Sequence, residues 1–298
     1  MVRLQRSRRR GASGEGDPVP TDELVDDAGD HDVADEVEEP DEEPDEEPRR
    51  TSVVTEGLGR RRLSPRSWTP LLLLQTTHPK QAVVTALALG GVAVLTGREP
   101  REVGVIVCTV LVGQAMLGWH NDVVDRRKDQ DNQAPGKPVA DGRLDPGTVW
   151  YAIVAAFWVL LPLAVTTGIT AGCIYMGSVA VGMLGNVLLR TGFFSWWSWA
   201  VSFAMLPAYL SYGGWGGQAL GSPPETSITV LAALLGIGVH FTRSVWGLVA
   251  DHAEGWTYLP LKLGLKIGAT RLLMLSTLYT VVIVVLVGVF GARDGLAR

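Results

Sequence analysis

One stretch of this chain, residues 121–129 (NDVVDRRKD), carries residue types suited to metal and phosphate chemistry. On a continuous helix Asp122, Asp125 and Asp129 share one face, and Asn121 adds an amide oxygen to it. Carboxylates this close repel one another, and the repulsion costs more beside a bilayer, where water is scarce. A hard divalent cation offsets it. The spacing therefore predicts a Mg²⁺ site with Asn121, Asp122, Asp125 and Asp129 as its ligands.

Basic residues around this stretch are suited to bind the phosphates that a protein-bound Mg²⁺ often bridges. The candidates for this role are Arg126, Lys128, Lys137, Arg143 and, further along the chain, Lys262. A second interpretation is a solvated helix end whose acidic and basic residues simply pair with each other. The position of the stretch at the end of a long apolar run favours the binding site.

A second acidic pair, Asp251 and Glu254, follows a later apolar run. The two residues are three apart, so they share a helical face. We expect them at the same membrane face as the first stretch, where they would add ligands to the metal site.

Seven apolar runs predict an all-α polytopic transmembrane helical bundle. They lie near residues 79–97, 102–119, 149–167, 169–189, 193–212, 227–249 and 271–290. The only two cysteines, Cys108 and Cys173, lie inside these runs, which excludes a disulfide framework and a Cys/His metal site. Nothing in the charge pattern indicates a nucleic-acid partner.

Residues 1–66 differ sharply from the remainder of the chain. Their basic start and long acidic, Pro-punctuated run contain too little apolar surface to offset chain entropy, which predicts a disordered tail. The chain thus divides into a tail over residues 1–66 and a membrane domain over residues 67–298. The tail accounts for the net charge of −5, and any partner of its acidic run is unidentified.

Loop charges predict the orientation in the cell membrane. Basic residues concentrate in the loops after the second and sixth runs, whereas the loops after the third and fifth runs have none. The positive-inside rule then places the N-terminus and both acidic stretches at the cytoplasmic face.

These residues resemble the UbiA superfamily of intramembrane prenyltransferases over roughly residues 70–290. The first motif of that family, Asn-Asp-x-x-Asp-x-x-x-Asp, is matched at every fixed position by residues 121–129. Residues 137–142 (KPVADG) are similar to its Arg-Pro-Leu-x-x-Gly sequel, and residues 255–264 to the tail of its second motif. Of the two aspartates usual in that second motif, Asp251 matches one, and the region of Gly247 replaces the other.

The resemblance implies an enzyme that transfers an isoprenyl group from an isoprenyl diphosphate to a hydrophobic acceptor, with Mg²⁺ as cofactor and membrane lipid around it. Asp125, Asp129 and Asp251 would be the catalytic carboxylates. The acceptor, whether an aromatic ring, a quinone precursor or a lipid alcohol, is left open. Two alternatives also remain: a catalytically idle, lipid-binding member of the same fold, and an ion or solute transporter.

Overall fold

The computed structural model describes residues 68–214 and 221–294, and all regular structure within these ranges is helical. The predicted all-α architecture is therefore confirmed for this part of the chain. The disordered tail predicted for residues 1–66 lies outside the described residues. Every helix discussed below lies within one compact unit of the chain.

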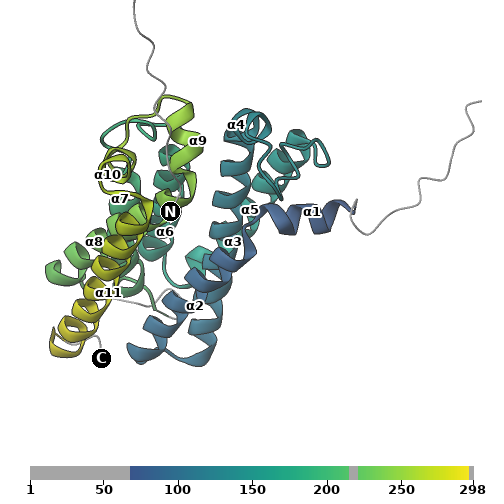
Figure 1. Cartoon of the computed structure of the whole chain (residues 1–298). Coiled ribbons are helices and arrows are strands. Elements are labelled where there is room, and N and C mark those ends of the chain that lie inside the picture. The colour runs from purple at the N-terminus through teal and green to yellow at the C-terminus, as the bar shows by residue number, and fades with distance from the viewer. Residues whose placement is uncertain (1–67, 215–220, 295–298) are drawn as a thin grey trace, which may run out of the picture. The chain divides into compact units, whose positions relative to one another are not determined.

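Each predicted apolar run forms a helix or most of one (Figure 1). In chain order the helices are α1 (Thr69–Thr76), α2 (Pro79–Leu95), α3 (Pro100–Val124), α4 (Arg126–Asp131), α5 (Pro146–Thr166), α6 (Ile169–Gly185), α7 (Trp197–Ser211), α8 (Thr226–Ser244), η3 (Val245–Gly247), α9 (Leu248–Ala253), α10 (Leu259–Ile267) and α11 (Ala269–Asp294). The largest boundary differences are five residues: α3 ends at Val124 rather than near residue 119, and α8 ends at Ser244 rather than near residue 249.

Four of these helices are long and apolar enough to cross a membrane: α3, α5, α11 and the continuous stretch Thr226–Ala253. The pair α1 and α2 passes the same test when taken together, with a bend of 58° between them. Helix α6 is apolar but shorter. Large apolar side chains such as Val84, Trp158 and Val249 are strongly exposed, as expected for surfaces that face lipid rather than water.

Proline marks the start of five helices, because its fixed φ suits the first turn, where its missing N–H is not needed. These prolines are Pro70, Pro79, Pro100, Pro146 and Pro260. Helix α5 has in addition a side-chain cap, since Asp145 accepts a hydrogen bond from the backbone N–H of Thr148 at 3.0 Å.

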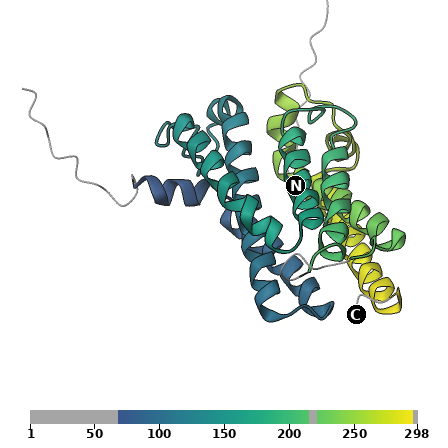
Figure 2. The ribbon, with the colours of Figure 1, turned by 180° about the vertical axis from the view of Figure 1, so that it is seen from behind.

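Helices α2, α3, α5, α6 and α7 enclose the main apolar core, which includes Val110, Tyr175 and Tyr209. A smaller core joins α9, α10 and α11 around Leu248 and Leu261. Figures 1 and 2 show α4 and α9 at the same end of the helices, so the two acidic segments of the sequence reach one face of the bundle.

The break between α1 and α2 is held against α3 by a close backbone approach. A Cβ atom at Gly118 would lie 2.8 Å from the carbonyl oxygen of Thr77, so only glycine fits there. His78, the next residue, has a left-handed backbone with φ 53°, an unfavourable conformation for a residue with a Cβ atom. The close contact places the His78 side chain beside the last turn of α3.

Replacing Gly118 by alanine is expected to destabilise the protein, because the added methyl group meets backbone that cannot move aside. Overpacking of this kind costs about 1–3 kcal/mol. Gly91→Ala is a matched control, since a Cβ atom at Gly91 meets nothing within 4 Å. Thermal unfolding in detergent should show a lower Tm for Gly118→Ala and an unchanged or higher Tm for Gly91→Ala. Equal Tm values would contradict the close approach.

Candidate functional site

The end of α3 places a buried carboxylate at the centre of a polar cluster. Asp122 accepts hydrogen bonds at the same oxygen, Oδ1, from His78 Nε2 at 2.9 Å and from Lys137 Nζ at 2.7 Å. Its other oxygen, Oδ2, is buried and has no hydrogen-bond partner among the described residues. A buried carboxylate oxygen without a partner is costly, so this atom is available to a ligand.

Lys137 also connects the two ends of the first motif. Its Nζ atom lies 3.2 Å from Asp129 Oδ2 as well as 2.7 Å from Asp122 Oδ1. Burial opposes the charge on Lys137, but the attraction of both carboxylates outweighs it and raises the pKa of the lysine. Burial raises the pKa of Asp129 despite the nearby lysine. The carboxylates of Asp122 and Asp129 thus approach one shared cation.

Asp125 faces a different cation. Helix α3 ends at Val124 and α4 begins at Arg126, so the helix is interrupted at Asp125. Its Oδ1 atom accepts a hydrogen bond from Arg190 Nη1, in the segment after α6. The face predicted for a continuous helix is therefore divided between two cations, Lys137 and Arg190.

In the second acidic segment, both oxygens of the buried Asp251 are engaged. Lys128 of α4 donates to Oδ1, and the hydroxyl of Tyr258 donates to Oδ2. Burial, reinforced by this hydrogen bond, raises the pKa of Tyr258 and keeps it a donor. A Cβ atom at Gly247 would lie 2.8 Å from Asp251 Oδ2, so Asp251 occupies the space next to the glycine.

Four of the charged residues that the sequence predicted for the site do not join these clusters. Glu254 is exposed and accepts a hydrogen bond from Asn132 Nδ2 at 2.9 Å. Arg143 pairs with Asp141, two residues away, through a contact of 2.6 Å. Arg126 and Lys262 are exposed and form no ion pair with any residue that the structure describes.

Among residues 68–214 and 221–294, no three His, Cys, Asp or Glu side chains gather as a preformed metal site. The acids instead face cations of the chain itself: Asp122 and Asp129 face Lys137, Asp125 faces Arg190, and Asp251 faces Lys128. The sequence left open an alternative in which acidic and basic residues of this region pair with each other. Such pairs are present in this structure.

A cavity of about 260 Å³ extends from this cluster into the bundle. Asn121, His78 and Lys137 line it near the motif, and Val110, Leu206 and Val239 supply part of its apolar wall. Polar groups also reach it from several helices: Gln81, Gln114, Ser178, Ser202 and Arg243.

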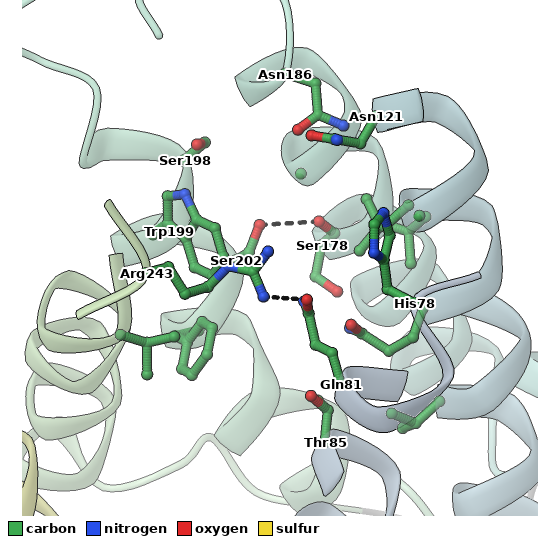
Figure 3. A pocket seen from close by; sticks show the side chains of 18 of the residues that line it. His78, Gln81, Thr85, Asn121, Ser178, Asn186, Ser198, Trp199, Ser202 and Arg243 are labelled. Carbon is green, nitrogen blue, oxygen red and sulfur yellow. Dashed lines mark hydrogen bonds between the residues drawn. The ribbon is translucent and has the colours of Figure 1, made fainter. Parts of the chain in front are cut away.

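Figure 3 shows Arg243 of α8 pointing across the cavity to Gln81 of α2, with which it forms a hydrogen bond. The guanidinium also lies over the ring of Trp199, 5.6 Å from its centroid. An arginine inside a helical bundle is costly unless polar or anionic groups meet it. The cavity therefore combines an apolar wall with one cationic, hydrogen-bonding side.

His78, Arg190 and Tyr258 belong to the clusters but were not among the site residues that the sequence predicted. Arg190 is a single basic residue in the loop after the fourth apolar run, and no motif around it indicates a binding site. His78 precedes Pro79 at the start of an apolar run, and this position alone does not indicate a partner 44 residues away. The contacts of His78 and Arg190 both depend on which segments pack together in the folded protein.

The fold and the site define a helical membrane protein with a carboxylate-rich cluster at one end of the bundle and a partly polar cavity beneath it. Residues 82–296 match the model of the UbiA prenyltransferase family. The match covers well over half of the chain, and the protein belongs to this family. No curated protein sequence matches the chain.

Solved structures of a UbiA homologue from Archaeoglobus fulgidus have the same fold. With the homologue bound to GPP and Mg²⁺, the TM-score is 0.56 at 15% identity, over 72% of this chain and 76% of that chain. With the homologue bound to DMAPP and Mg²⁺, the TM-score is 0.54 at 16% identity, over 72% of this chain and 75% of that chain. With the homologue bound to Cd²⁺, the TM-score is 0.55 at 14% identity, over 74% of this chain and 79% of that chain.

Proposed function

We propose that this protein transfers an isoprenyl group from an isoprenyl diphosphate to a hydrophobic acceptor inside the membrane, with Mg²⁺ as cofactor. Membership of the prenyltransferase family gives the class of reaction. The observation that carries the proposal for this chain is the cluster of carboxylates and cations at the mouth of a cavity within the helices.

The donor atoms present fit Mg²⁺. This ion prefers oxygen ligands and usually takes one or two carboxylates together with substrate phosphates. Asp122 Oδ2 is buried without a partner, and Asp129 Oδ2 makes no hydrogen bond of good geometry although Lys137 lies nearby. Asp122 and Asp129 would hold the ion, with Asn121 and Asp125 beside them. When bound, Mg²⁺ would neutralise the diphosphate and make it a better leaving group.

The cations of the chain would stabilise charge on the departing diphosphate. Lys137, Arg190 and Lys128 each face a carboxylate in this structure. A diphosphate offers them stronger, multiply charged acceptors. Charge that develops on the leaving group would meet donors already near their final positions, which is the main electrostatic contribution to such a step.

The cavity would receive the reacting groups and keep water away from the carbon that becomes cationic. Its apolar wall suits an isoprenyl chain. Arg243 and Gln81 suit a polar group on the acceptor, whether that acceptor is an aromatic compound, a quinone precursor or a lipid.

No observation favours transport over transfer. A transporter needs acidic residues within the depth of its spans. The buried acids of the described spans stand at helix ends: Glu102 near the start of α3, paired with Arg98, and Asp122 near its end. Asp251 likewise lies near the end of the stretch Thr226–Ala253.

The decisive experiment incubates purified, detergent-solubilised protein with labelled geranylgeranyl diphosphate, Mg²⁺ and a panel of acceptors. Diphosphate release that requires both Mg²⁺ and an acceptor, together with a prenylated product, is the expected result. Binding of the donor without release would support the idle, lipid-binding alternative and overturn the proposed activity.

We also propose that the cluster faces the cytoplasm, as the loop charges predict. A cysteine introduced at Lys137 should then react with a membrane-impermeant thiol reagent only after the cells are opened, in a background without Cys108 and Cys173. Labelling of this cysteine in intact cells would reverse the orientation.

A further inference from the structure

We propose that Trp256 is a positioning residue that holds Lys128 and Arg190 together at the diphosphate site. This inference rests on the proposed function, because it assigns the two cations to a diphosphate. Trp256 lies in the loop after α9, outside the acidic pair that the sequence singled out.

The ring of Trp256 contacts both cations. Lys128 Nζ lies 3.5 Å from the ring centroid, and Arg190 Cζ lies 5.0 Å from it. A cation over the face of an aromatic ring is attracted by the ring quadrupole, most strongly for tryptophan and most strongly where water is scarce. One side chain therefore stabilises two cations from distant parts of the sequence.

These contacts place Trp256 where two ion pairs meet. Lys128 also pairs with Asp251, and Arg190 pairs with Asp125. The ring thus joins the second acidic segment to the first, and a change in its position would alter both ion pairs together.

The backbone around Trp256 is held by hydrogen bonds that do not involve the side chains of the two cations. The N–H group of Trp256 donates to the carbonyl oxygen of Asp251 at 3.0 Å, and that of Thr257 donates to the carbonyl oxygen of Thr191 at 2.9 Å. The ring of Tyr258 packs edge to face against the Trp256 ring, with the two ring centroids 5.9 Å apart. The ring is therefore a support for the cations rather than a side chain that follows them.

An aromatic face suits this task better than another carboxylate would. Lysine and arginine lose much rotamer freedom when they are ordered, and two like charges repel. The Trp256 ring holds both cations without neutralising them or competing with phosphate oxygens. Cations ordered before the ligand arrives bind it more tightly, because less freedom is lost on binding.

The test measures binding of inorganic pyrophosphate with Mg²⁺ to the full-length protein by calorimetry. Trp256→Leu should weaken this binding about 10- to 30-fold, the effect of losing one or two desolvated cation–π contacts. Trp256→Phe keeps a weaker ring and should restore part of the affinity. Trp246→Leu is the matched control, because Trp246 is 82% exposed. This variant should bind pyrophosphate with the affinity of the parent.

Two further readouts separate positioning from a merely structural role. Tryptophan emission of the parent should change when pyrophosphate and Mg²⁺ bind, and Trp256→Phe should lose that change. A lower Tm with unchanged pyrophosphate affinity in Trp256→Leu would overturn the proposal.

Failure of this proposal can be distinguished from failure of the proposed function. If the parent binds pyrophosphate but transfers no prenyl group, the enzymatic activity is refuted, and the affinities of the variants still decide the role of Trp256. If the parent does not bind pyrophosphate with Mg²⁺, the assignment of Lys128 and Arg190 to a diphosphate is refuted, and the role of Trp256 with it.

Discussion

Asp122→Asn is expected to lower the rate of prenyl transfer by about 10²- to 10³-fold, the usual effect of removing one electrostatic contact of the transition state. The substitution keeps the size of the side chain but removes the charge that faces His78 and Lys137 and the buried oxygen available to Mg²⁺. Turnover measured across a Mg²⁺ titration should show a loss that is largest at limiting metal.

Two companion variants sharpen this test. Asp131→Asn changes an exposed residue of α4 and should behave like the parent. Asp251→Asn should cost less than Asp122→Asn, because Lys128 and Tyr258 already engage both oxygens of Asp251. If Asp122→Asn keeps parental activity at limiting Mg²⁺, Asp122 does not hold the ion, and the Mg²⁺ site proposed at the end of α3 is wrong.

Lys137→Met is expected to lower kcat/KM for the donor by about 10²-fold, with a raised KM, because it removes the cation shared by Asp122 and Asp129. The change has a pH signature. Burial already raises the pKa of Asp129, and Lys137 counteracts the rise. Without the lysine this pKa should rise further, so Asp129 needs a higher pH to bind metal in the variant than in the parent, and the variant gains affinity relative to the parent as the pH increases.

Mg²⁺ binding to Lys137→Met and to the parent, measured by calorimetry at several pH values, checks this expectation. Lys80→Met is a suitable control, since Lys80 is exposed on α2. The control should match the parent throughout. A metal affinity in Lys137→Met that does not improve relative to the parent with rising pH would show that Asp129 is not a ligand.

The sequence by itself determined the helices. Apolar runs of about membrane-spanning length can satisfy their backbone hydrogen bonds in lipid only as helices, so the runs predicted α2, α3, α5, α6, α7, α8 and α11 within a few residues at most ends. Helices α3 and α5 begin at Pro100 and Pro146 for a purely local reason, because the fixed φ of proline suits the first turn of a helix. The motif from Asn121 to Asp129 likewise indicated that an amide, carboxylates and basic side chains lie together at one end of a span.

Only the tertiary structure decided which side chains meet. Arg190 reaches Asp125 because the segment after α6 packs beside the end of α3, whereas Arg143 turns back to the nearby Asp141. His78 reaches Asp122 because glycine at position 118 lets two backbones approach closely. Helical periodicity relates residues a few positions apart. Contacts between distant loops depend on the packing of whole helices, which no local spacing determines.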